Sequence, residues 1–426
     1  NFEARLLHYT TADKGRSWQY EEIYRGAGTH EADAFDIEGD TFRVAGKPCD
    51  HTHVQIWERP GKPSPLNRFR HRFVDRQKPN TATDILAVDV DGDGRQDIVC
   101  GAWWYRNPSW ERRTIPGIYQ AINALDIDGD GRAEIIATKR REGEKSWYPA
   151  LSSDLYWLKA VDPLKGKWEE HHIGVGDGQW PHGTFVGRIL PADGLALVCG
   201  YHGPGGRFPE VFEAPADPTQ PWPKRILAEV AYGEEIVGCD MTGSGTTDLV
   251  AGHHWLENMG DGTFTVHTVG EGDLKTARVR VADVNGNGRM DIIVVEEDLS
   301  YEKQESYYRV VAWLENPGDP RVTPWPLHVI DRVRCPHSLD VADLDGDGEL
   351  ELVVGEHDPF KPERSRSRLL VYKKAEPNGR AWKRFVLDDR FEHHDGAKII
   401  ELDKGRLGIM SHGWAEGQWV HLWEPA

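Results

Sequence analysis

The chain has 426 residues, of which 38% are hydrophobic and 28% charged, and its formal net charge is −19. The excess of 70 acidic over 51 basic residues argues against nucleic acid or an anionic membrane as a partner, because both attract basic surfaces. No uninterrupted apolar run approaches the roughly 18 residues of a membrane-spanning helix, so we expect no membrane insertion. The five cysteines are scattered and odd in number, which excludes a disulfide framework.

In chain order, the predicted elements are short strands around a recurring acidic loop. Complete copies of the DxDGDGxxD type occupy residues 89–97, 126–134, 283–291 and 343–351. Degenerate copies lie at 36–40 and 240–248, and weaker ones lie near Arg188 and at Glu401. Most copies are followed by an apolar strand, a strand with an aromatic residue such as HWLENM or VAWLENP, and a fourth short strand. Eight copies of such a four-stranded unit predict a β-propeller.

The blade number and the closure of the ring can also be predicted. We expect an all-β protein with one domain over residues 1–426: a single propeller of eight four-stranded blades, with seven blades as the alternative. The N-terminal RLLHY at 5–9 resembles RLLVY at 368–372. This predicts closure by pairing of N- and C-terminal strands, which removes an exposed sheet edge. The segment 419–423 leaves one strand surplus, so a seven-bladed ring with an accessory hairpin stays open.

The acidic loops predict structural calcium. Carboxylates or amides at loop positions 1, 3, 5 and 9 place hard oxygen ligands around one point, and the glycines permit the left-handed turns that such a loop needs. An ordinary acidic hairpin turn is the alternative. We predict calcium in the four complete loops and none in the degenerate copies. The predicted ligands are Asp89, Asp91, Asp93, Asp97, Asp126, Asp128, Asp130, Glu134, Asp283, Asn285, Asn287, Asp291, Asp343, Asp345, Asp347 and Glu351.

The combination of DxDGDGxxD, an apolar strand and WLENPG resembles the FG-GAP/VCBS-type calcium-loop β-propellers over nearly the whole chain. Proteins of this kind include non-catalytic adhesion and integrin-type propellers. They also include propeller lyases of ulvan, rhamnogalacturonan and rhamnosyl-glucuronate polymers, and the aldos-2-ulose dehydratases. The resemblance implies the fold and does not choose among these functions.

Histidines collect at two equivalent positions of the repeat, namely the start of the first strand and the end of the second. Both positions are expected around the central channel, on the face opposite the calcium loops. Single histidines that cap strands or pack between blades are the alternative. The catalytic candidates are His182, His253, His337, His394 and Tyr201. The candidates for substrate binding, taken from the same positions and from long loops after the second strands, are His30, Lys139, Arg207, Arg278, His202, His357, His412, Trp103 and Trp147.

A channel rich in His, Tyr, Lys and Arg suits proton abstraction next to a carbonyl or carboxylate group. We therefore expect an enzyme, a carbon–oxygen lyase that cleaves a uronate-containing polysaccharide or oligosaccharide by β-elimination. One alternative is a dehydratase or isomerase of a small keto-sugar such as an anhydrofructose or aldos-2-ulose. Another is a non-catalytic glycan- or protein-binding propeller. The net charge of −19 counts against an acidic substrate unless the cleft is locally positive.

The expected partners and location follow from the same features. Calcium loops of this kind saturate best where calcium is millimolar, so we expect a secreted or periplasmic monomer whose partner is a carbohydrate. The start at Asn1 without methionine agrees with a mature or trimmed form. Channel histidines, for example His253, His337 and His357, could hold a second divalent metal, because three imidazoles bind a transition metal with one open position.

Overall fold

The structure is a computed structural model that describes residues 4–10, 19–26, 31–38, 41–47, 55–59, 66, 68–78, 82–139, 152–201, 208–230, 234–270, 277–296, 308–357, 367–394, 396–413 and 419–426. The chain divides into two compact units, residues 1–68 and 69–426. Throughout the described ranges, no helix is long and apolar enough to cross a membrane.

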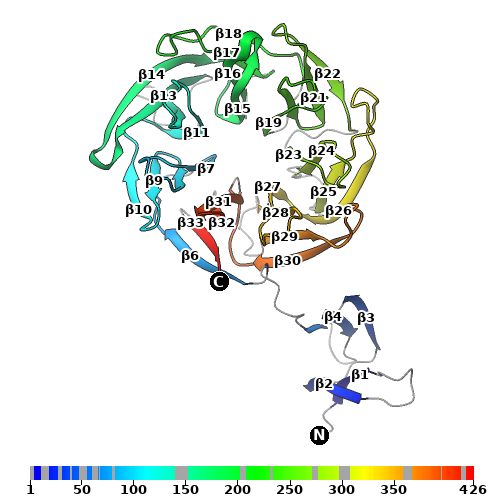
Figure 1. Cartoon of the computed structure of the whole chain (residues 1–426). Helices are drawn as coiled ribbons and strands as arrows, with labels where there is room; N and C mark the ends of the chain where they lie inside the picture. Colours follow the sequence, from blue (N-terminus) through cyan, green and yellow to red (C-terminus); the bar gives the residue numbers. More distant parts are fainter. Residues whose placement is uncertain are drawn as a thin grey trace. The chain divides into compact units, whose positions relative to one another are not determined.

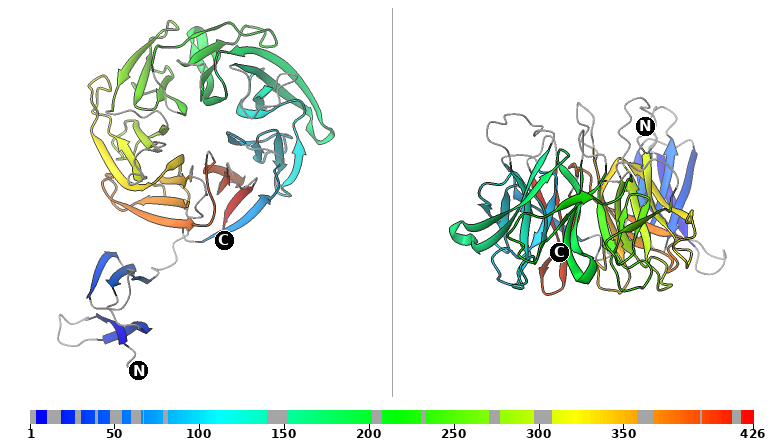
Figure 2. Two further views of the ribbon diagram at one scale, coloured as in Figure 1. Left: turned by 180° about the vertical axis from the view of Figure 1, so that it is seen from behind. Right: turned by 90° about the horizontal axis from the view of Figure 1, so that it is seen from above.

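The second unit is a β-propeller of seven four-stranded blades around a central channel (Figures 1 and 2). Blades 1 to 3 contain β7 (Ile85–Val88), β8 (Asp97–Cys100), β9 (Trp103–Arg106), β10 (Glu111–Thr114), β11 (Gln120–Leu125), β12 (Glu134–Lys139), β13 (Ser153–Asp162), β14 (Lys167–Gly176), β15 (Pro181–Leu190), β16 (Gly194–Tyr201), β17 (Glu210–Glu213) and β18 (Lys224–Ile226). Blades 4 to 6 contain β19 (Ile236–Cys239), β20 (Asp248–Ala251), β21 (His254–Asn258), β22 (Phe264–Thr268), β23 (Ala277–Ala282), β24 (Asp291–Glu296), β25 (Tyr308–Leu314), β26 (Leu327–Arg334), β27 (Pro336–Ala342), β28 (Glu351–Glu356), β29 (Leu369–Lys374) and β30 (Trp382–Asp388). Blade 7 contains β31 (Lys398–Asp403), β32 (Arg406–His412), β33 (Val420–Pro425) and β6 (Phe69–Asp75). Two short 3-10 turns are η2 (Pro163–Lys165) and η3 (Pro191–Asp193).

The predicted number of eight blades is wrong, and the alternative of seven is confirmed. Seven of the eight sequence copies lie within residues 69–426, and the eighth, at 36–40, falls where β3 (Glu31–Glu38) meets β4 (Thr41–Lys47). These two strands pair with β5 (Gln55–Arg59) in a three-stranded sheet of the first unit. The remaining strands of that unit, β1 (Ala4–Thr10) and β2 (Gln19–Gly26), pair with each other.

The ring closes through β6, the first strand of the second unit. It pairs antiparallel with β33 near the C-terminus, from Phe69 opposite Pro425 to Asp75 opposite Val420. The predicted use of 5–9 for closure is wrong, because this segment belongs to β1 and pairs with β2. The sequence FRHRFVD of β6 resembles WKRFVLD of β30, so it already carried the pattern of a fourth strand.

The hydrophobic core lies between neighbouring blades. Each second strand is a nearly continuous apolar run, and in β24 all six residues are buried, as expected for a strand covered on both faces. One cluster joins Val250 and Trp255 of blade 4 to Ile292 of blade 5, and equivalent clusters join other pairs of blades. The third strands contribute buried tryptophans to this core: Trp104, Trp157, Trp255, Trp313 and Trp423.

The acidic loops are ordered by hydrogen bonds from the backbone. In blade 1 the Asp89 carboxylate accepts bonds from three N–H groups of its own loop. The Asp97 carboxylate accepts one bond from the N–H of Val90 at 3.1 Å and another from the N–H of Asn107 at 2.7 Å. The same bonds to the ninth loop residue recur in blades 4 and 5. The repeated acids therefore close the loops and attach them to the third strand.

An asparagine of the third strand links neighbouring blades. The Nδ2 atom of Asn258 donates to the carbonyl of Thr247 in its own blade at 3.0 Å and to the carbonyl of Ile189 in blade 3 at 2.9 Å. We expect Asn258→Ala to lower the free energy of unfolding by about 1–3 kcal/mol, because two carbonyl groups lose their donor. Urea unfolding measures this loss. An equal loss in Gln220→Ala, whose side chain is exposed, would contradict the role of the link.

Candidate functional site

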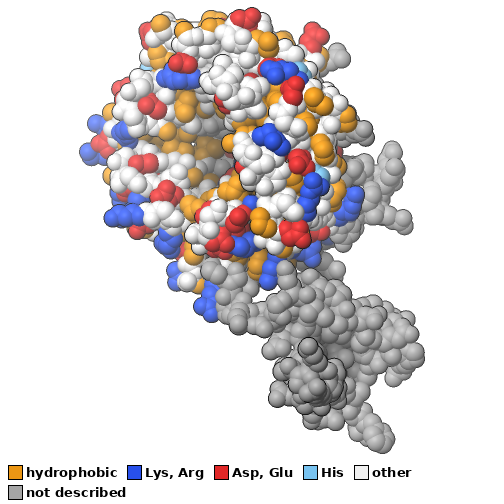
Figure 3. All heavy atoms as spheres, turned by 45° about the vertical axis from the view of Figure 1, so that its right-hand side comes forward, with side chains coloured by type: hydrophobic (Ala, Val, Ile, Leu, Met, Phe, Trp, Pro, Cys, Tyr) orange, Lys and Arg blue, Asp and Glu red, His pale blue; other side chains and the backbone are white. Residues whose placement is uncertain are grey.

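The channel holds a cavity of about 300 Å³, lined by residues at the first strands of all seven blades. Figure 3 shows the ring hollowed at its centre, with hydrophobic side chains around the opening. Much of the lining is apolar and comes from β7, β11 and β31, including Ile85, Ile122 and Ile399. The cavity therefore has an apolar side, which faces a side with charged groups.

Four charged side chains of the cavity neutralise one another. Arg280 lies 2.6 Å from Glu235 and 2.9 Å from Asp340, measured between nitrogen and oxygen atoms. The Nζ atom of Lys398 lies 2.6 Å from Oε1 of Glu235. Burial alone would raise the pKa of Glu235, but the cations of Arg280, Lys398 and Arg278 lower it to about 2. Two positive and two negative charges thus cancel inside the channel.

Arg278, on β23, is the centre of a buried polar group. Its Nε atom donates to the carbonyl of His337 at 3.0 Å, and its Nη2 atom lies 3.1 Å from Nε2 of His337. Glu234 Oε2 lies 3.3 Å from Nη2, and Nδ1 of His182 lies 3.4 Å from Nη1. All four side chains are buried. A guanidinium can only donate, and Nε2 of His337 also lies 3.4 Å from Oε2 of Glu234, so this imidazole contacts both the cation and the carboxylate.

His337 also belongs to a second group, which we call the imidazole cluster: His337, His357 and His394 together with Glu392. The ring centroids are 4.4 Å apart for His337 and His394, and 4.2 Å apart for His357 and His394. Oε1 of Glu392 lies 3.4 Å from Nε2 of His357. These residues come from β27, the end of β28 and the segment between β30 and β31. The cluster therefore brings one carboxylate beside the imidazole of His357.

Two other catalytic candidates make different contacts. The hydroxyl of Tyr201 donates to Oε2 of Glu210 at 2.5 Å, and its ring packs in the core between blades 2 and 3. The ring of His253 contacts that of His254 at 4.2 Å. Burial, together with His253, lowers the pKa of His254 to about 4. The structure thus brings His182 and His337 to Arg278, and His394 to His337, whereas Tyr201 belongs to an interblade core.

The candidates for substrate binding also lie in different surroundings. His357 and Arg278 belong to the two groups above. Lys139 forms an ion pair with Glu170 at 2.5 Å, Trp103 lies in the core between blades 7 and 1, and His412 is fully buried. Four further candidates lie outside the described residues: His30, His202, Arg207 and Trp147.

Glu392 was not among the predicted site residues. It directly precedes His393 and His394, ahead of the first strand of blade 7. An acidic residue next to two histidines at this place could have identified Glu392 from the sequence. The two histidines have different surroundings. His394 is half-buried in the imidazole cluster, whereas His393 is fully buried and its Nδ1 lies 2.7 Å from Oγ of Ser411.

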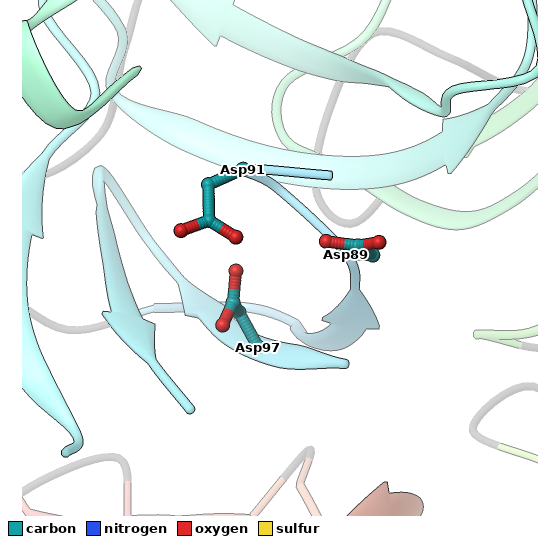
Figure 4. Close-up of side chains that lie close together, drawn as sticks. All are labelled: Asp89, Asp91 and Asp97. Carbon is teal, nitrogen blue, oxygen red and sulfur yellow. The ribbon is translucent and has the colours of Figure 1, made fainter. Parts of the chain in front are cut away.

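Three acidic loops present oxygen atoms that fit a cation. Their ligand atoms lie within 4.8 Å of one another in three sets: Asp89, Asp91 and Asp97; Asp126, Asp128 and Glu134; and Asp343, Asp345 and Asp347. In Figure 4 the carboxylates of Asp91 and Asp97 point toward one another, with Asp89 beside them. The buried Oδ1 atoms of Asp91 and Asp345 make no hydrogen bond. As carboxylate oxygens, they are ligands of the kind that calcium prefers. The other predicted ligands do not complete such a set in the part of the chain that is described: Asp93, Asp130, Asp283, Asn285, Asn287, Asp291 and Glu351.

The channel histidines differ from these loops. Across the described ranges, only the three loop sets bring acidic, histidine or cysteine side chains close enough together to bind a metal ion. The imidazole cluster is not among these sets. The ring contacts join His357 to His337 and His394, whereas His253 contacts His254. A second divalent metal in the channel stays a prediction.

Comparisons with known proteins support the repeat. An FG-GAP-like repeat matches residues 240–294, which cover most of blade 4 and the first half of blade 5. No curated protein matches. A solved structure from a study of two prolyl endopeptidases is similar over 90% of this chain, at 10% identity and a TM-score of 0.38. The alignment covers 53% of the endopeptidase chain, so this chain spans about half of that protein's length. The *V. cholerae* biofilm matrix protein Bap1 aligns over 99% and 87% of the two chains, at 12% identity and a TM-score of 0.18. The chain is thus a seven-bladed propeller with an FG-GAP-like repeat.

Proposed function

We propose that this propeller is a carbon–oxygen lyase that acts on a carbohydrate by β-elimination at the imidazole cluster. The observation that carries the proposal is the contact of three imidazoles with one another, with Glu392 beside His357 and with Arg278, which lines the channel cavity, beside His337. Elimination needs a base and an acid close together, and imidazoles serve as both near neutral pH.

In this proposal His394 supplies the base and His357 supplies the acid. His394, which is half-buried, accepts the proton from the carbon next to the carbonyl or carboxylate group of the sugar. The electron pair of that C–H bond forms the new double bond, and the C–O bond at the next carbon breaks. His357, whose Nε2 atom lies 3.4 Å from Oε1 of Glu392, donates a proton to the departing oxygen. His337 is a positioning residue in this scheme, since Arg278 holds its Nε2 atom.

Two substrate classes undergo this reaction. A uronate-containing glycan is the first, and a small keto-sugar, as in a dehydratase, is the second. Arg278 donates within the protein, and Arg280 and Lys398 are paired with Glu235. This pairing of the cavity's described cations favours a neutral carbonyl sugar over a carboxylate.

Ultraviolet absorbance tests the proposal, because elimination creates a conjugated double bond. The protein would be mixed in turn with ulvan, rhamnogalacturonan, gum arabic, alginate, glycosaminoglycans and an anhydrofructose. We expect an increase with one of these substrates and its loss in His394→Ala. The matched control is His172→Ala, which removes a histidine paired with Asp154 on an outer strand. A flat trace on every substrate would leave a glycan- or protein-binding propeller as the better hypothesis.

We also propose that the acidic loops with Asp89, Asp126 and Asp343 bind calcium where it is millimolar, without depending on the ion for their closure, and that the protein works as a secreted or periplasmic monomer. The imidazole cluster is not among the described groups spaced for a metal, so no step of the elimination is assigned to a metal there. Elemental analysis of the protein in millimolar calcium measures the bound calcium and any other divalent metal, and light scattering measures the oligomeric state.

A further inference from the structure

One residue of the third strand faces each acidic loop. It pairs, in sheet register, with the ninth loop residue, and we call it the partner residue. In blade 6 this pair is Glu351 and Lys373. The registers of the other blades with a recognisable loop place Arg106 opposite Asp97, Lys159 opposite Glu134, Glu257 opposite Asp248 and Glu315 opposite Asp291.

The charge of the partner residue follows the charge of its loop. In blades 1, 2 and 6, loop positions 3 and 5 are both aspartate, and the partner residue is Arg or Lys. In blade 4 these positions are Thr242 and Ser244, in blade 5 they are Asn285 and Asn287, and the partner residue is Glu in both. In these five blades the partner residue is thus basic where loop positions 3 and 5 are both aspartate, and acidic where both are uncharged.

The side chains make the contacts that this pattern predicts. The Nζ atom of Lys373 lies 2.6 Å from Oδ2 of Asp345, 2.6 Å from Oδ2 of Asp347 and 3.2 Å from Oε1 of Glu351. All three carboxylates belong to the loop, and the side chain of Lys373 is largely shielded from solvent. A single ammonium group therefore engages three acids at the place where a calcium ion would need their oxygens.

Blades 1, 2 and 5 agree, whereas in blade 4 Glu257 pairs with Arg321 and His267. In blade 1, Arg106 contacts Asp91 at 2.5 Å and Asp93 at 3.2 Å, and in blade 2 Lys159 contacts both Asp128 and Asp130. In blade 5 the contact is reversed, because the amide of Asn285 donates to Glu315. This reversal is expected if the partner residue complements whatever the loop presents.

We propose that Arg106, Lys159 and Lys373 are internal counter-ions that hold the three most acidic loops closed without calcium and weaken their affinity for it. Each loop is already closed by backbone N–H groups that bond its first and ninth acids. What these loops still need is a positive charge among their carboxylates, and the partner residue supplies it. Calcium takes six to eight oxygen ligands, so it must displace the side-chain cation or bind beside a like charge.

Substitution of Lys373 by methionine tests this proposal, since it removes the charge and keeps the length of the side chain. We expect the melting temperature of the wild-type protein to be nearly the same in EDTA and in calcium. Lys373→Met should melt several degrees lower in EDTA and recover in calcium. Isothermal titration should show the calcium affinity of the variant rising by roughly tenfold, as expected for removal of a nearby like charge.

Lys383→Met is the matched control, because Lys383 lies opposite Lys373 on β30 and contacts the ring of Phe385. It should leave both measurements unchanged. Lys159→Met in blade 2 repeats the test in an independent loop. The proposal would be overturned if the wild-type protein lost stability in EDTA as strongly as the variants, or if neither Lys→Met variant bound calcium more tightly.

Discussion

Substitution of Arg278 by methionine is expected to lower the free energy of unfolding by about 3–5 kcal/mol, because it leaves a buried carboxylate without its cation. Glu234 is buried, and its Oε2 atom lies 3.3 Å from Nη2 of Arg278. The same guanidinium bonds the carbonyl of His337 and contacts the ring of His182. Its removal therefore affects three neighbouring blades, and urea unfolding at pH 7 measures the loss.

Two further variants separate the buried charge from the loss of side-chain packing. In Arg278→Met/Glu234→Gln the unpaired carboxylate is absent, so this double variant should be more stable than Arg278→Met alone. The control is Arg321→Met, whose half-exposed guanidinium pairs with Glu257. It should cost no more than about 1 kcal/mol, as is usual for an exposed ion pair. Equal losses in Arg278→Met and Arg321→Met would show that the buried pair has no special role.

The propeller could be predicted because each blade repeats one local pattern. An acidic loop between two strands and a buried aromatic third strand can be recognised without knowledge of long-range contacts. The number of blades could not be predicted in the same way. The copy at 36–40 has the local pattern, yet its strands β3 and β4 pair with β5 rather than within the ring. Ring closure depends on which strand completes the sheet of β33, and both 5–9 and β6 carry suitable sequences.

Part of the candidate site could also be predicted from the sequence. The repeat placed His182 and His337 at equivalent positions, with Arg278 one residue past that position in blade 5, and the structure brings the three together. It could not show that Tyr201 would turn into an interblade core, because neighbouring positions of one strand point to opposite faces. Glu392 lies before the first strand of blade 7, outside the repeated positions, so register alone could not identify it.

The seam that closes the ring contains buried histidines. Nε2 of His71, on β6, lies 3.0 Å from Nδ1 of His421, on β33. His393 lies beside them, with ring centroids 6.2 Å from His421. Burial lowers the pKa of His421 well below its usual value, and the neighbouring histidines lower it further. Burial also lowers the pKa of His393 to about 3, although Asp388 acts in the opposite direction.

The closed ring is therefore expected to lose stability when the pH falls below about 6.5, where histidines of the unfolded chain take up protons. The folded seam stays neutral, so the unfolded state binds more protons between pH 6.5 and about 3, and the free energy of unfolding falls with pH in this window. Each fully protected imidazole contributes up to about 1.4 kcal/mol per pH unit. His71 contributes less because it is only half-buried and Asp388 opposes the effect.

His421→Gln tests this expectation, because glutamine keeps a polar side chain at the seam and does not titrate. Urea unfolding between pH 8 and pH 5 should show a shallower loss of stability for the variant than for the wild-type protein, by close to one proton. Buried carboxylates such as Asp97, whose pKa burial raises to about 7, titrate in both proteins alike, so the difference between the two slopes reports His421. His172→Gln, on the outer strand β14, removes a histidine outside the seam, and its slope should stay closer to that of the wild-type protein. If His421→Gln and the wild-type protein lost stability equally as the pH falls, the expectation would be wrong. Exclusion of a proton from His421 would then contribute nothing to the pH dependence of the seam between β6 and β33.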